Sequence, residues 1–163
     1  MKSQITLHLS KQKFKFSSGH FLIFDKTRAE KLHGHNYSVK VKLKSSANQD
    51  LGTSGYLVDF SEIKKIIQES LDLWDEHVLL PAQHPDMKFS QKGKNLEVHF
   101  RDRFYSFPQN EVHLLPTVNT SVEELSRLLA EDFFKKMKKW TITEVWVLVE
   151  ETPGQGASFL ARG

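Results

Sequence analysis

Residues 34–45 alternate strictly between apolar and polar side chains, and this pattern constrains the fold more than any other. The apolar positions run from Tyr37 to Leu43 on one face, while serine and lysine occupy the other. A period of two residues is typical of a β-strand with one buried face. Residues 142–149 repeat the pattern, and residues 4–17 alternate in two runs of opposite phase, which indicates a bulge or bend.

Two capping-box sequences predict helices, Asp59-Phe-Ser-Glu62 and Thr120-Ser-Val-Glu123. Each is followed by apolar residues at helical spacing, namely Phe60, Ile63, Ile67 and Trp74 in the first and Val122, Leu125, Leu129 and Phe133 in the second. We expect one or two hairpins in residues 81–115 and a last short strand at 157–161. Strands and helices segregated in this way favour an α+β fold with an antiparallel sheet.

Length and composition narrow the class of protein. A chain of 163 residues fits one domain with its own core, so we treat residues 1–163 as a single domain. No window approaches eighteen apolar residues, so we expect no membrane span. The absence of cysteine excludes disulfides, thiolate metal ligands and a cysteine nucleophile. Because the N-terminus also lacks the apolar run of a secretory signal, we expect a cytoplasmic protein.

Positive charge is concentrated in the first part of the chain. Residues 1–44 carry ten lysine and arginine side chains against only Asp25 and Glu30, although the net charge is just +3. This half of the chain could attract an anionic substrate or a phosphate backbone, or it could be an ordinary solvated surface. It lacks the interleaved aromatics that stack bases, so we expect no nucleic-acid partner.

His33-Gly34-His35 is the sharpest local signal for chemistry. Alternate residues of a strand point the same way, so the two imidazoles can converge on one point. His20 ends the preceding strand, and a hairpin between the two strands would bring it close. Three imidazoles without cysteine suit zinc and leave a fourth position open, which is the catalytic arrangement. The alternative is that all three are unrelated loop or core histidines.

Several carboxylates could assist such a site. Glu30 lies three residues before His33 and could act as a general base beside a metal-bound substrate. Asp75 and His77 could relay a proton, although charged residues are also common at helix ends. One of the adjacent Glu150 and Glu151 must face inwards, where it could bind a guanidine-like pair of N–H groups.

These segments together resemble the 6-pyruvoyl-tetrahydropterin synthase / 6-carboxy-tetrahydropterin synthase family. The resemblance rests on FKFSSGH at 14–20, LHGHNY at 32–37, GYLVDF at 55–60, DEHVLLP at 75–81, NTSVE at 119–123 and VEET at 149–152. The segments are collinear with the family pattern and cover nearly the whole chain. Residues 82–115 form an insertion relative to the shortest members.

The resemblance implies the tunnelling fold, a four-stranded antiparallel sheet with two helices on one face, which oligomerises into a β-barrel. It implies a homo-oligomer, typically a hexamer made of two trimers, and 7,8-dihydroneopterin triphosphate as the class of substrate. His20, His33 and His35 match the zinc ligands. Glu151 matches the glutamate that anchors the pterin, and Thr120 and Ser121 lie in a segment that contacts it.

The sequence departs from the family pattern in two places. Most members have a catalytic cysteine before the HGH motif, and this chain has none. Glu30 in its place resembles the subgroup that cleaves the side chain to give 6-hydroxymethyl-7,8-dihydropterin for folate synthesis, with the glutamate as the base. In the proton relay, Glu76 stands where a histidine is expected after Asp75, and we favour His77 as the replacement.

Alternatives stay open at this point. The product could instead be 6-carboxy-tetrahydropterin, as in the queuosine pathway, or 6-pyruvoyl-tetrahydropterin, although the missing cysteine argues against both. The altered relay would also fit a member that binds a pterin or purine without turnover.

Overall fold

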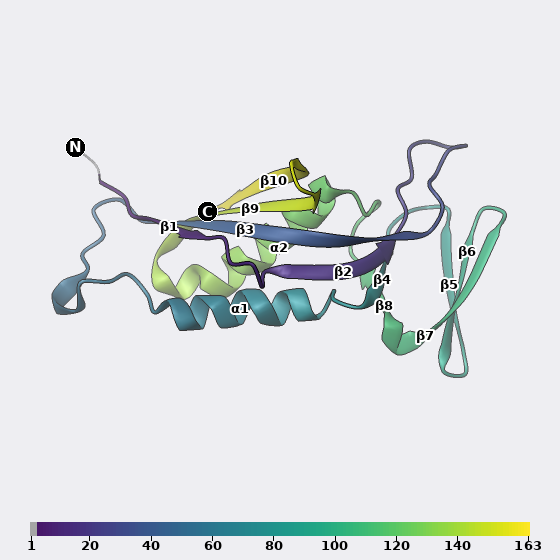
Figure 1. Ribbon diagram of the computed structural model, residues 1–163, viewed down its shortest axis with the longest axis horizontal. Coiled ribbons are helices and arrows are strands. Elements are labelled where there is room, and N and C mark those ends of the chain that lie inside the picture. Colours follow the sequence, from purple (N-terminus) through teal and green to yellow (C-terminus); the bar gives the residue numbers. More distant parts are fainter. Residues whose placement is uncertain (1–2) are drawn as a thin grey trace.

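The alternating run forms β3 (His33–Ser45), the central strand of the main sheet. Figure 1 shows the computed structural model, which describes residues 3–163. The other strands are β1 (Thr6–Leu9), β2 (Lys15–His20), β4 (His77–Pro81), β5 (Met87–Lys92), β6 (Asn95–Phe100), β7 (Arg103–Pro108), β8 (Val112–Leu115), β9 (Ile142–Thr152) and β10 (Gln155–Arg162). The two α-helices are α1 (Phe60–Asp72) and α2 (Val122–Met137).

The main sheet is larger than the predicted four antiparallel strands, and it is mixed. Its order is β10-β9-β3-β2-β4-β8, and β1 also pairs with β3. The section from β10 to β2 is antiparallel as predicted, but β4 pairs with β2, and β8 with β4, in parallel. The two parallel strands lie after α1 and at the end of the insertion, in short segments whose alternation cannot identify a neighbour.

The two runs of opposite phase in residues 4–17 are separate strands. β1 and β2 both pair with β3, and the chain turns out of the sheet between them. The predicted change of phase is therefore a break that lets Leu9 and Phe16 both face the core, where they are 2% and 1% exposed.

Both helices cover one face of the main sheet (Figure 1). Ile63 and Ile67 of α1 and Leu125 and Phe133 of α2 are fully buried against the apolar face of β3 and β9. Contrary to the prediction, Phe60 does not belong to this buried stripe. It is 44% exposed at the first turn of α1.

The cap of α1 is the predicted residue, whereas the cap of α2 lies one residue later than expected. Asp59 caps α1 as predicted, and its carboxylate accepts the N–H of Ser61 at 2.7 Å. In α2 the cap is Ser121 rather than Thr120, and its hydroxyl accepts the N–H of Glu124. The Thr120 hydroxyl is committed elsewhere, because it donates to the carbonyl of Phe21.

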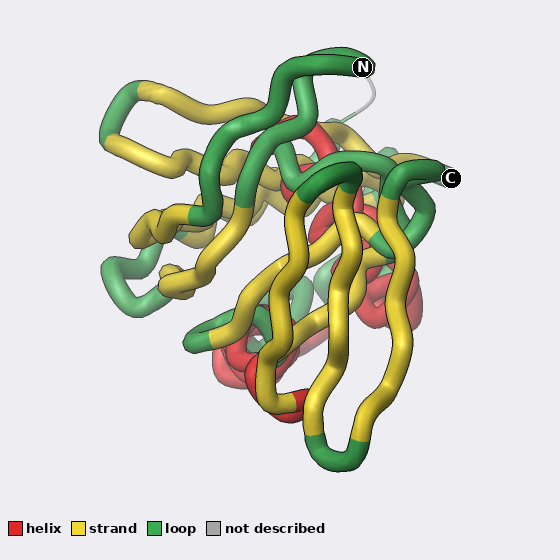
Figure 2. Tube along the Cα trace, turned by 90° about the vertical axis from the view of Figure 1, so that its right-hand side faces the viewer, coloured by secondary structure: helices red, strands yellow, loops and turns green. Residues whose placement is uncertain are grey.

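Residues 87–108 form a small antiparallel sheet in the order β5-β6-β7, so the one or two hairpins expected in residues 81–115 are two. It lies beyond one end of the main sheet in Figure 1, and Figure 2 looks towards that end. A second apolar cluster joins it to the rest of the fold through Phe21, Ile23 and Leu80. None of the helices in residues 3–163 is long and apolar enough to cross a membrane.

Candidate metal centre and active site

The hairpin of β2 and β3 brings the three predicted histidines together. His20 and His33 are direct partners in the register, and His35 follows two residues later on the same face of β3. One ring nitrogen of each histidine lies within 4.8 Å of the other two. This is the one group of three such side chains with metal-binding geometry in the part of the chain that the structure describes.

The unused ring nitrogens of two histidines are anchored to backbone carbonyls. Nδ1 of His20 lies 3.0 Å from the carbonyl oxygen of Thr120, and Nδ1 of His33 lies 2.8 Å from that of Lys31. A carbonyl can only accept, so each Nδ1 carries the proton and each Nε2 presents a lone pair. This arrangement of a metal-ligating histidine with an orienting acceptor is common in zinc sites.

The Nε2 atoms are placed as metal ligands would be. Nε2 of His20 is buried and has no hydrogen-bond partner, although burying an unpaired polar atom is costly. Nε2 of His33 and Nε2 of His35 lie 3.0 Å apart. Two nitrogens at about 2.0–2.1 Å from a tetrahedral zinc would be separated by roughly 3.4 Å. The residues present therefore fit a zinc ion.

Burial keeps His20 in the neutral form that a metal requires. The side chain is 1% exposed, and this loss of hydration lowers the pKa of His20 to about 4, from an ordinary value of 6.5. The carbonyl of Thr120 partly opposes that shift. Near neutral pH the imidazole is thus unprotonated at Nε2 without any metal bound.

Two carboxylates lie close to the triad, each next to a different histidine. Oε2 of Glu30 lies 3.7 Å from Nε2 of His33, and Oε2 of Glu151 lies 3.8 Å from Nε2 of His35. Glu30 is oriented by the N–H of Leu22, which donates to Oε2 at 3.0 Å. Glu151 rather than Glu150 is the neighbour of the triad, because Glu150 pairs with Lys40 at 3.1 Å.

Asp75 and His77 lie beside β2, the strand that carries His20. The predicted contact between the Asp75 carboxylate and the His77 imidazole is not formed. The carboxylate of Asp75 accepts the N–H of Ser17 at 2.7 Å. The ring of His77 instead donates from Nδ1 to the backbone carbonyl of Asp75 at 2.6 Å. His77 and His35 line the same open cleft of about 370 Å³, together with Glu76 and Glu111.

Thr120 and Ser121 lie behind the triad. Thr120 is fully buried, and its carbonyl and hydroxyl contact His20 and Phe21. The Ser121 hydroxyl caps α2. The structure thus places Thr120 where it orients a histidine, whereas the resemblance implied that this segment contacts substrate.

Supporting residues that the sequence did not single out also surround the site. Asn119 clamps the loop after β2, since its side chain accepts from the N–H of Ile23 and donates to the carbonyl of the same residue. Gln155 donates to Oε1 of Glu151 at 2.7 Å. The hydroxyl of Tyr37 is buried without a partner, and its ring lies next to His20 and His35. Burial is the main cause that raises the pKa of Tyr37, and the nearby charges of Glu151 and Glu30 add to the shift. Asn119 stands in the NTSVE segment, whereas no motif marked Gln155.

The fold and the site define a class of protein, an α+β chain that holds an open three-histidine centre between two carboxylates. The family model for 6-pyruvoyl tetrahydropterin synthase matches residues 9–162, and the chain belongs to this family of tetrahydropterin synthases.

Named relatives agree with this assignment. The chain is 32% identical over 148 residues to a putative 6-carboxy-5,6,7,8-tetrahydropterin synthase of Methanocaldococcus jannaschii, covering 89% of this chain and 88% of the relative. The structure resembles a crystal structure of 6-pyruvoyl tetrahydropterin synthase from Plasmodium vivax, with a TM-score of 0.87, 26% identity and 99% coverage of both chains. A variant of that Plasmodium enzyme, in which a catalytic glutamate is replaced by alanine, matches with the same TM-score and 25% identity.

Proposed function

We propose that this chain is a zinc-dependent lyase that acts on 7,8-dihydroneopterin triphosphate and releases 6-hydroxymethyl-7,8-dihydropterin. The observation that carries the proposal is the position of Glu30, whose carboxylate lies 3.7 Å from the triad in a chain without cysteine. A catalytic glutamate also exists in the Plasmodium vivax relative, which supports the same role here.

Glu151 is the proposed anchor of the pterin ring. Its side chain is 16% exposed, and Oε2 faces His35 while Oε1 accepts from Gln155. A largely buried carboxylate can accept two parallel hydrogen bonds from the amino group and ring N–H of a pterin. Because Glu151 lies near the end of β9 and next to the triad, a pterin bound there would direct its side chain towards the histidines.

Glu30 is the proposed base. Cleavage breaks the bond between the first and second side-chain carbons of the substrate. Glu30 takes the proton from the hydroxyl of the second carbon, the first carbon gains a proton, and the remaining two carbons leave as a phosphorylated aldehyde. The N–H of Leu22 holds the carboxylate in place for this transfer. A zinc ion on the triad would supply a Lewis acid that polarises the side-chain hydroxyls.

His77 is the proposed proton donor to the first carbon. Its Nδ1 is bound to the carbonyl of Asp75, which leaves Nε2 for exchange of a proton in the cleft it shares with His35. Asp75 would then act through its backbone carbonyl, and its carboxylate would hold β2 through Ser17.

Product analysis tests this proposal. Purified protein is incubated with zinc and 7,8-dihydroneopterin triphosphate, and the pterins are separated and identified by mass. We expect 6-hydroxymethyl-7,8-dihydropterin as the main product. Only a 6-carboxy product, as the name of the Methanocaldococcus relative suggests, or only a 6-pyruvoyl product would replace the proposed activity with a sister activity. Tight pterin binding with no turnover would indicate a non-catalytic member.

A further inference from the structure

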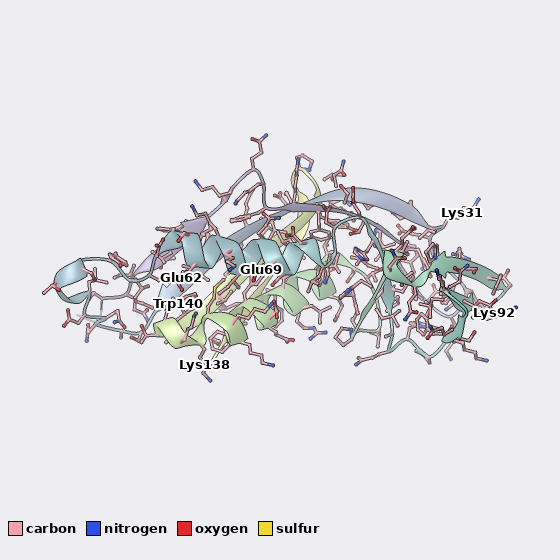
Figure 3. The ribbon with its side chains drawn as sticks, turned by 90° about the horizontal axis from the view of Figure 1, so that it is seen from below. Lys31, Glu62, Glu69, Lys92, Lys138 and Trp140 are labelled. Carbon is pink, nitrogen blue, oxygen red and sulfur yellow. The ribbon has the colours of Figure 1, made fainter. Side chains whose placement is uncertain are left out.

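The small sheet packs directly on the segment that carries Glu30. Val98 and Phe100 of β6, both fully buried, share an apolar cluster with Phe21 and Ile23, which follow β2. Ala29 and Leu32, on either side of Glu30, pack against the same cluster. In Figure 3, Lys31 of this segment and Lys92 of β5 lie at the same end of the molecule, away from Trp140.

Glu30 is held on one side by the segment that follows His20. Its N–H donates to the carbonyl of Leu22 at 2.9 Å, and the N–H of Leu22 donates back to its carboxylate. Ile23 and Ala29 form an antiparallel bridge just beyond. These contacts set the distance between Glu30 and the β2 end, but they leave the two carbonyls at Ala29 and Glu30 to other donors.

Arg103, the first residue of β7, supplies those donors. Its guanidinium donates from Nη1 to the carbonyl of Glu30 and from Nη2 to the carbonyl of Ala29, the latter at 3.1 Å. The rings of Phe21 and Phe100 lie 5.8 and 5.7 Å from its Cζ atom, so cation–π contacts add to its anchoring. A planar fork on two successive carbonyls restrains the backbone of Glu30 in a way that a single donor cannot.

We propose that Arg103 is a positioning residue that sets the orientation of the Glu30 carboxylate at the triad, and that this is a function of the small sheet. The proposal rests on the role of Glu30 given above. Arg103 acts through the backbone carbonyls of Ala29 and Glu30 rather than on the pterin or the metal. Its loss should therefore misplace the base while substrate and zinc still bind.

The test compares Arg103→Gln with Arg101→Gln as the matched control. Arg101 lies in the turn before β7. Its side chain binds the carboxylate of Asp86 and the carbonyl of Asp25, which precedes Glu30 by five residues in the segment between β2 and β3. We expect Arg103→Gln to lower kcat by about 10- to 100-fold, since a displaced catalytic group loses rate steeply. KM and zinc content should stay within about twofold of the parent, and Arg103→Lys should recover part of kcat. Arg101→Gln should leave kcat unchanged.

A double-mutant cycle with Glu30→Ala separates the two claims. If Arg103 acts through Glu30, Arg103→Gln should lower kcat in the parent but have no further effect on the residual rate of Glu30→Ala. An equal fold-loss in both backgrounds, an unchanged kcat, or an equal loss in Arg101→Gln would overturn the role of Arg103. Full turnover in Glu30→Ala alone would instead overturn the proposed function.

Discussion

Each triad histidine depends on a different neighbour for its orientation. His20 is held by the backbone of Thr120 at the start of α2, a hundred residues further along the chain, and His33 by the carbonyl of Lys31 two residues before it. His35 lies 3.8 Å from the carboxylate of Glu151. The centre is therefore assembled from β2, β3, β9 and the residue just before the α2 cap, so it forms only when the sheet and this segment are in place.

A histidine outside the triad gives a pH prediction. His113 lies on β8 in a cleft lined by Trp74, Asp132 and Lys136, and burial followed by the nearby His77 lowers its pKa. The unfolded chain then binds a proton more readily than the fold, so the contribution of His113 is complete above pH 6.5 and is lost as the pH falls below that value. Urea unfolding of the metal-free protein at several pH values measures this slope.

His113→Gln should make the loss of unfolding free energy towards low pH less steep than in the parent. Identical slopes in the parent and in His113→Gln would mean that His113 is equally protonated in both states, contrary to the burial seen here.

Among the elements, β4 has a special position because it joins the two cores. Leu79 is fully buried in the cluster under the helices, and its neighbour Leu80 is fully buried in the cluster under the small sheet. Successive strand residues point to opposite faces, so one strand can serve both cores. The small sheet is therefore packed against the main fold through side chains and is not held only by the two segments that connect it to the rest of the chain.

Leu79→Ala and Leu80→Ala form a matched pair that tests this coupling. Each should lower the unfolding free energy by about 2–5 kcal/mol, as expected for a buried leucine. Both should shift a single unfolding transition in denaturant, followed by tryptophan fluorescence and by circular dichroism. If Leu80→Ala instead produced an early separate transition while the main one stayed in place, the two cores would be independent units.

The elements also show how far the sequence alone leads. Periodicity predicted β3, β9 and the buried stripes of both helices, because a strand or helix with one buried face repeats its pattern locally. The parallel partners β4 and β8 were missed, since strand neighbours depend on contacts between distant segments. The α2 cap was misplaced by one residue because a pattern cannot show that Thr120 already donates to Phe21.

The residues of the site also fall into those that the sequence predicts and those that only the fold reveals. The three histidines, Glu30 and Glu151 could be predicted because they lie in short motifs at strand ends. Arg103 and Gln155 could not, because each acts on a residue brought near it only by the fold. The contact of His77 with the carbonyl rather than the carboxylate of Asp75 likewise depends on the local turn.

For the whole molecule, the terminal strands of the main sheet predict self-association. β10 and β8 end the sheet order, and each has one side without a strand partner among residues 3–163. Open edges favour pairing with a second chain, and a closed barrel of subunits removes them. We expect the hexamer that the family resemblance implies, and light scattering after size-exclusion chromatography should give about six chain masses. A single chain mass at micromolar concentration would contradict this.

The most direct test of the account is a comparison of parent and Glu30→Ala for zinc content and turnover in the same preparations. In the proposed mechanism the three histidines hold the metal and Glu30 takes the proton, so the variant should keep the full zinc content of the parent. Its rate with 7,8-dihydroneopterin triphosphate should fall by about 10²- to 10⁴-fold, as for the loss of a general base. Turnover at the parental rate with zinc retained would show that Glu30 is a bystander.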